Sequence, residues 1–167
     1  MLGLLQSGAS IHGGRAIAEV ALKGDPSAIP FPRGLIKENT LDFSFSGLKT
    51  ALRGQVHSMS EREQAARLPD IAASFELAII DALVAKTIKA MEHCDIKSVA
   101  LTGGVAANTK LRTTLHREVT LRGGTLVYPS PFFCTDNAAM IAVAGRFHLM
   151  NGRRSGYDLD ADPRMKL

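Results

Sequence analysis

Two short apolar runs in the last third of the chain, residues 97–102 and 125–128, constrain the fold most strongly. Each has the length and composition of a buried strand and ends where glycines or a proline follow. Helical segments are expected after both turns, over residues 105–118 and 135–150. This alternation of strand, helix, strand and helix predicts an α/β layer with a covered sheet.

The first half of the chain is predicted to be mostly helical. Ser60 and Glu63 have the spacing of a capping box, which indicates that a long helix begins there and runs to about Glu92. Pro69 is expected to divide this helix, because proline lacks the N–H group that an interior turn requires. A shorter helix is expected to end at Gly24.

The expected organisation has two parts within one compact unit. Residues 1–95 form the mostly helical part, and residues 96–167 form the α/β part. Prolines and glycines at residues 30–34 forbid regular structure and make this stretch the best candidate for a joint between subdomains. A length of 167 residues suits one domain.

Composition excludes several classes of protein. Apolar residues make up 46% of the chain, which is enough for one core, and no run approaches the length of a transmembrane helix. The start lacks the pattern of a signal peptide. Cys94 and Cys134 have neither disulfide-framework nor zinc-finger spacing, so a reducing compartment is expected, the cytoplasm or alternatively the mitochondrial matrix or another organelle. The net charge of +4 permits an anionic partner without requiring one.

The first candidate site is the Gly103–Gly104 pair, where a strand leads into a helix. Without side chains, the backbone there can approach a phosphate or sugar closely. Asn108 adds amide donors and an acceptor in the first helical turn. The alternative is a strand-to-helix turn that only needs glycine for a positive φ.

The second candidate is Asp136, which stands at the start of the last helix. Its carboxylate could ligate a cation, or Asp136 and its neighbour Thr135 could simply cap the helix. Cys134 could be a soft ligand or a nucleophile, although a small buried cysteine is commoner.

A third segment, Asp42–Thr50, gathers hydroxyls, a glycine and a lysine. Its spacing is not that of a phosphate-binding Walker loop. A short strand or extended loop followed by a helix that starts near Gly47 is the simpler interpretation.

Together, several strings resemble the tRNA N6-adenosine threonylcarbamoyltransferase family (TsaD type), formerly labelled glycoprotease or O-sialoglycoprotein endopeptidase. The resemblance runs from Gly3 to Leu167 and is carried, in order, by HGG (12–14), FPR (31–33), LDFSFSGLKT (41–50), DIAASF (70–75), LTGGVAAN (101–108) and CTDNAAMIA (134–142).

This resemblance implies one lobe of an actin-like ATPase (ASKHA, ribonuclease H-like) fold, with a helical N-terminal insertion. Gly14, Gly103, Gly104 and Asn108 are implied to contact a nucleotide, and Asp136 to ligate one divalent metal ion, iron or zinc. The other metal ligands, two histidines in the first lobe of the family, are not in this sequence. The resemblance assigns no catalytic acid or base.

The implied activity is the transfer of threonylcarbamoyl from threonylcarbamoyl-AMP to N6 of the adenosine next to the anticodon, with release of AMP. The implied partners are tRNA, threonylcarbamoyl-AMP or ATP, a missing N-terminal lobe and the other subunits of a tRNA-modification complex, with no membrane. Alone, this lobe is expected to be inactive. The alternatives are a stand-alone nucleotide-binding or assembly module, which would expose an apolar face for a partner lobe, and a metalloprotease, for which no H-E-x-x-H motif is present.

Overall fold

The computed structural model describes residues 13–157 and residue 160. His12 of the HGG motif lies outside the described residues. In chain order the helices, strands and short 3-10 turns are α2 (Gly13–Ala21), α3 (Ser46–His57), α4 (Glu61–Cys94), β1 (Ser98–Ala100), η1 (Gly104–Ala107), α5 (Thr109–Leu121), β2 (Thr125–Val127), η2 (Pro131–Phe133) and α6 (Ala138–Met150).

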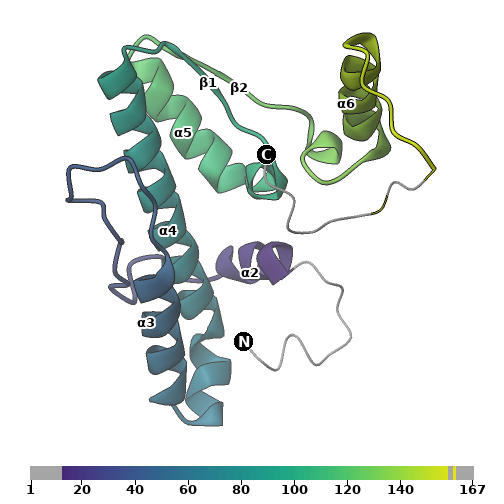
Figure 1. Ribbon diagram of the computed structural model, residues 1–167. Coiled ribbons are helices and arrows are strands. Elements are labelled where there is room, and N and C mark those ends of the chain that lie inside the picture. The colour runs from purple at the N-terminus through teal and green to yellow at the C-terminus, as the bar shows by residue number, and fades with distance from the viewer. Residues whose placement is uncertain (1–12, 158–159, 161–167) are drawn as a thin grey trace.

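Helix α4 is the long element against which α2, α3 and α5 pack (Figure 1). The predicted capping box is confirmed at its start. The Ser60 hydroxyl oxygen accepts from the Glu63 N–H at 3.4 Å, and the Ser60 N–H donates to the Glu63 carboxylate at 2.9 Å. Two otherwise unpaired donors of the first turn are therefore satisfied.

The prediction that Pro69 divides this helix is wrong, because α4 continues through it. An interior proline costs about 3 kcal/mol, so other contacts must offset it. Helix α2 supplies them by packing on the turn that follows Pro69. Gly24 lies so close that a Cβ there would be 2.0 Å from the Pro69 carbonyl oxygen. Beside it, a small apolar cluster joins the two helices through Ala21, Ala72 and Ala73.

The segment between α2 and α3 is fastened to α4 by Ser74, which is fully buried. Its hydroxyl accepts from the Ile29 N–H at 3.1 Å and donates to the Asp25 carbonyl at 3.2 Å. Residues 42–45 form an extended loop and no strand, and α3 begins at Ser46. A second core cluster joins the connection between α2 and α3 to the helices α3 and α4. It consists of Ile29, Phe31, Leu48, Ile71 and Ala78.

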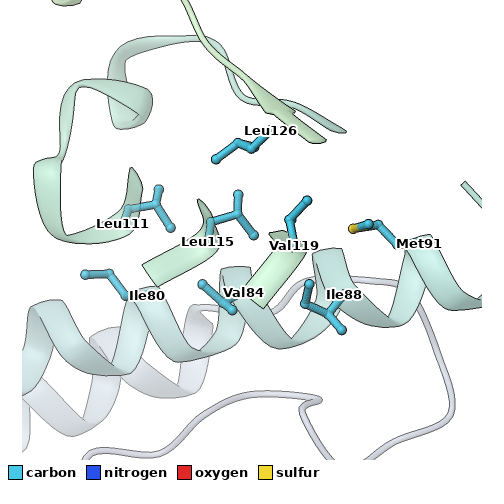
Figure 2. Close-up of a cluster of buried hydrophobic side chains, with 8 residues drawn as sticks. All are labelled: Ile80, Val84, Ile88, Met91, Leu111, Leu115, Val119 and Leu126. Atoms are coloured by element: carbon cyan, nitrogen blue, oxygen red, sulfur yellow. The ribbon is translucent and has the colours of Figure 1, made fainter. Parts of the chain in front are cut away.

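Strands β1 and β2 pair in parallel, with Val99 opposite Leu126. Figure 2 shows the main core beneath β2, where Leu126 faces α5 and α5 in turn lies on α4. The cluster consists of Ile80, Val84, Ile88, Met91, Leu111, Leu115, Val119 and Leu126. The expectation of a fully covered sheet is wrong, since Ser98 and Ala100 of β1 and Thr125 and Val127 of β2 are exposed. In the described part of the chain the two helices cover one face of this small sheet and leave the other open.

Helix α6 stands apart from the other helices (Figure 1). None of its residues is buried, and large apolar side chains, Met140, Ile141, Val143, Phe147, Leu149 and Met150, are at least half exposed. A helix that is apolar on all sides is normally enclosed by other elements. Among the described residues, no helix is both long enough and apolar enough to cross a membrane.

Candidate functional site

The loop after β1 begins with a glycine in the left-handed region. Gly103 has φ of +84°, so the turn does need glycine at this position. A Cβ at Gly103 or Gly104 would nevertheless meet no atom within 4 Å. The space over this stretch of backbone is open, which is the condition that a bound phosphate or sugar requires.

Asn108 ends this loop and caps α5. Its Oδ1 accepts from the Leu111 N–H at 2.8 Å, and its Nδ2 donates to Glu76 Oε1 at 2.7 Å. The second Glu76 oxygen lies 3.7 Å from the Lys110 ammonium, and the Glu76 side chain is only 12% exposed. These contacts fix the orientation of the amide and leave one Nδ2 hydrogen for a ligand.

Asp136 does not cap the last helix, so the alternative interpretation, a cap at Thr135 or Asp136, is wrong. The cap is Asn137, whose Oδ1 accepts from the Met140 N–H at 3.0 Å. Asp136 is exposed, and its carboxylate takes part in no hydrogen bond or salt bridge within the described residues. Asp136 is therefore a solvent-facing carboxylate that the start of α6 does not require.

Cys134 is only 3% exposed, which agrees with the commoner alternative of a small buried cysteine. Its Sγ lies 3.1 Å from Nη2 of Arg112. The same guanidinium donates through Nε to the carbonyl oxygen of Ala106, in the loop that leads to Asn108. The segment that bears Asp136 and the loop that bears Asn108 are thereby brought together through one side chain.

Gly14 lies in the first turn of α2, where it is exposed and where a Cβ would meet no atom within 4 Å. Helix α2 is held on α4 through Ile17, Val20 and Ala21. Within the described residues, no hydrogen bond joins Gly14 to either of the two loops.

The hydroxyls of residues 42–50 serve local structure. Thr50 Oγ1 donates to the Ser46 carbonyl at 3.1 Å, and Ser44 and Ser46 hydroxyls lie 3.3 Å apart. These contacts agree with a loop that leads into a helix start.

Two residues of the site, Glu76 and Arg112, were not predicted from the sequence. Glu76 is 32 residues from its partner Asn108, and Arg112 is 22 residues from Cys134. Neither carries a motif of its own. Only the crossing of α4 against the start of α5, and the return of the chain past β2, bring the partners together.

A groove of about 570 Å³ lies between α4, α5 and the loop around Arg33. Its charges are already engaged. Arg33 pairs with Asp81, whereas Arg117 and then Arg122 bond to Glu118 and hold the pKa of that carboxyl below its usual value. The groove therefore offers less to an anionic ligand than the open backbone at Gly103.

The residues that the structure describes do not provide a complete set of ligands for a metal ion. The described residues contain no group of three or more histidine, cysteine, aspartate or glutamate side chains that could hold an ion together. One carboxylate at Asp136 does not make such a site, since zinc and iron sites in proteins use three or more protein ligands.

Comparison with known proteins identifies the family. The family model described as tRNA N6-adenosine threonylcarbamoyltransferase (TsaD) matches residues 4–143. Proteins of that name from Geotalea uraniireducens and Bacillus subtilis are 45% and 44% identical over 90% and 93% of this chain. A third, from Desulfitobacterium hafniense, is 41% identical over 96% of it.

The match covers 44%, 45% and 47% of these relatives, so the chain spans about half the length of the curated relatives it matches. The parallel strand pair with its covering helices agrees with one lobe of the actin-like fold expected for these proteins. This chain therefore belongs to the tRNA N6-adenosine threonylcarbamoyltransferase family.

Proposed function

We propose that this chain is the C-terminal, nucleotide-facing lobe of a tRNA-modifying transferase. The reaction moves threonylcarbamoyl from threonylcarbamoyl-AMP to N6 of the adenosine next to the anticodon. Family membership supplies the reaction class. The observation that carries the assignment is the Arg112 connection, which joins the loop of Gly103 and Asn108 to the segment of Asp136.

In this reaction the N6 amine attacks the carbonyl carbon of the threonylcarbamoyl group. The bond between that carbon and the phosphate oxygen breaks, AMP leaves with the electron pair, and the amine loses a proton. Backbone N–H groups at Gly103 and Gly104 would hold the nucleotide phosphate, and the free Nδ2 hydrogen of Asn108 would bind the nucleotide. Gly14 would pack against its sugar or base. No described residue is assigned to take the proton.

Asp136 is proposed as one ligand of a divalent metal ion, iron or zinc. The residues present do not complete that site, so no step of the reaction is derived through the metal. The remaining ligands would come from a second polypeptide region, the N-terminal lobe.

Helix α6 supports the need for a partner lobe. Its exposed residues include Met140, Ile141, Val143, Phe147, Leu149 and Met150. Apolar side chains that are exposed together mark a protein interaction site. We therefore infer that the chain alone is inactive in transfer, and that it acts with an N-terminal lobe and with the other subunits of a tRNA-modification complex. Basic residues would contact tRNA phosphates and make binding salt-dependent. The compartment proposed is the cytoplasm, or alternatively the mitochondrial matrix or another organelle.

A stand-alone nucleotide-binding or assembly module is the second candidate, and the exposed α6 favours it equally. The two candidates differ in whether transfer appears once the missing half is supplied. The chain would be mixed with the portion of the Bacillus subtilis relative that it does not match, with tRNA and threonylcarbamoyl-AMP. Release of AMP and modified adenosine only in the mixture would support the transferase; nucleotide binding without transfer would support the module.

Nucleotide binding is tested on the chain itself by calorimetry with ATP. In Gly104→Val the new side chain enters the open space that the nucleotide would occupy, so ATP affinity should fall by about tenfold or more. Gly54→Val is the matched control, since Gly54 in α3 also has no atom within 4 Å of an added Cβ. Equal affinities in the two variants, or no ATP binding by the unmodified chain, would contradict the nucleotide site.

A further inference from the structure

Arg112 is hydrogen-bonded both to the loop that follows β1 and to the segment that follows β2. It lies in the first turn of α5 and is half-buried. Its Nε donates to the carbonyl oxygen of Ala106, on the glycine loop. Its Nη2 lies 3.1 Å from Cys134 Sγ and 3.5 Å from the Pro129 carbonyl oxygen, both on the segment that follows β2.

The same guanidinium also lies over the ring of Tyr128, with its central carbon 4.7 Å from the ring centroid. A cation over an aromatic face is attracted by the ring quadrupole. Three residues of the segment 128–134 thus contact one side chain, while a fourth contact holds the loop 102–108. In the described part of the chain, no other hydrogen bond joins that loop to that segment.

The chemistry of arginine suits this bridging role. The guanidinium is a rigid planar fork with five N–H donors, so one group can donate in two directions at a fixed angle. A lysine ammonium on its flexible stem keeps the charge but lacks this geometry. The two candidate ligand loops are therefore held at a separation that the fork defines.

We propose that Arg112 is a positioning residue that holds the Gly103–Asn108 loop and the Tyr128–Asp136 segment in a fixed relative position. A nucleotide bound at the loop then stabilises the segment through Arg112. This inference rests on the proposed function for the identity of the ligand. The holding of the segment itself does not depend on any ligand.

Cys134 provides the readout, because it is buried and directly contacts Arg112, whereas Cys94 is exposed and serves as an internal control. The labelling rate of each cysteine by a maleimide would be measured by peptide mass spectrometry on the full chain. Loss of the fork in Arg112→Gln should raise the Cys134 rate by about tenfold, since the segment opens more often, and should leave the Cys94 rate unchanged. Arg117→Gln, at an exposed position further along α5 where the guanidinium pairs with Glu118, should change neither rate.

The second arm adds ATP. ATP should slow labelling of Cys134 in the unmodified chain, although the nucleotide is placed at the glycine loop. Arg112→Lys should restore the melting temperature lost in Arg112→Gln but should not restore this protection, a distinction that a purely structural role would not produce.

The outcomes separate the two proposals. Equal Cys134 rates in Arg112→Gln and the unmodified chain would overturn the positioning role, whatever ATP does. ATP that binds but leaves the Cys134 rate unchanged would overturn the stabilisation of the segment by the nucleotide. If ATP does not bind the unmodified chain, the proposed nucleotide site fails, and the ligand-free labelling rates still decide whether Arg112 holds the segment.

Discussion

The ammonium group of Lys86 lies 2.6 Å from the carbonyl oxygen of Thr40, although Lys86 is only 2% exposed. A second carbonyl oxygen, that of Glu38, lies 3.3 Å from the same nitrogen. A buried ammonium needs partners, and here backbone carbonyls provide them. Lys86 thus fastens α4 to the loop that leads into the segment 42–50.

Replacing Lys86 with methionine should lower the free energy of unfolding by about 1–3 kcal/mol, because the part-buried Thr40 carbonyl loses its donor. Urea denaturation measures this change. Lys89→Met is the control. The Lys89 ammonium also donates to the Glu38 carbonyl oxygen, at 3.0 Å, but this hydrogen bond is exposed to solvent, so its loss should cost much less. Equal losses in the two variants would contradict the anchoring role of Lys86.

Gly24→Ala should destabilise the fold. The new methyl group would lie 2.0 Å from the Pro69 carbonyl oxygen, which is backbone and cannot rotate away. Overpacking of this kind costs about 1–3 kcal/mol. Gly54→Ala should have the opposite sign and add about 0.5–1 kcal/mol, since it replaces glycine inside a helix where there is room. Thermal melting of both variants tests the pair, and a neutral Gly24→Ala would argue against the close crossing of α2 and α4.

The capping box should make stability depend on pH in the acid range. The Ser60 hydroxyl, and then its backbone N–H, donate to the Glu63 carboxylate and hold its pKa below the ordinary value. A carboxyl whose pKa is lowered by folding stabilises the protein fully above its unfolded pKa, about 4.3, and this contribution disappears as the pH falls through the folded pKa.

The difference in stability between the unmodified chain and Glu63→Gln should therefore shrink as the pH is lowered from about 6 to 3. Denaturation at a series of pH values measures it. In a Ser60→Ala background the same difference should depend less on pH, because the hydroxyl donor is gone and only the Ser60 backbone N–H still donates to the Glu63 carboxylate. A difference that stays constant in the unmodified background would rule out the lowered pKa.

Asp136 and Asn137 should behave differently when replaced. Asn137→Ala removes the cap of α6 and should weaken this helix by about 0.5–2 kcal/mol, whereas Asp136→Asn should leave it unchanged. Hydrogen exchange of the amides at residues 138–142 reports the stability of the helix. Faster exchange in Asp136→Asn, to the extent seen in Asn137→Ala, would assign the capping role to Asp136 after all.

Contacts between residues within one helical turn could be predicted from the sequence, whereas contacts between residues far apart in the chain could not. The capping box at Ser60 is confirmed because both partners lie within one helical turn. The sequence leaves the cap of α6 open, because Thr135, Asp136 and Asn137 are all good capping residues and only the backbone geometry selects Asn137.

The wrong prediction at Pro69 and the contacts that the sequence did not predict share one cause, which is that the partners are distant in the chain. Pro69 stays inside its helix because α2 packs there, and no local rule anticipates that contact. The Thr40 partner of Lys86 is 46 residues away. Of the candidate site, the glycine turn is present, with a positive φ at Gly103, and the ligand roles of Gly103, Asn108 and Asp136 stay predictions. The contacts of Glu76 and Arg112 depend on how helices cross.

The exposed apolar helix α6 should affect how much of this polypeptide accumulates in a cell. A side chain such as Phe147, 65% exposed, presents to chaperones and proteases the same signal as an incompletely folded protein. The abundance of the polypeptide would then depend on the supply of the partner that covers α6. Copies without this partner would be bound by chaperones, aggregate or be degraded.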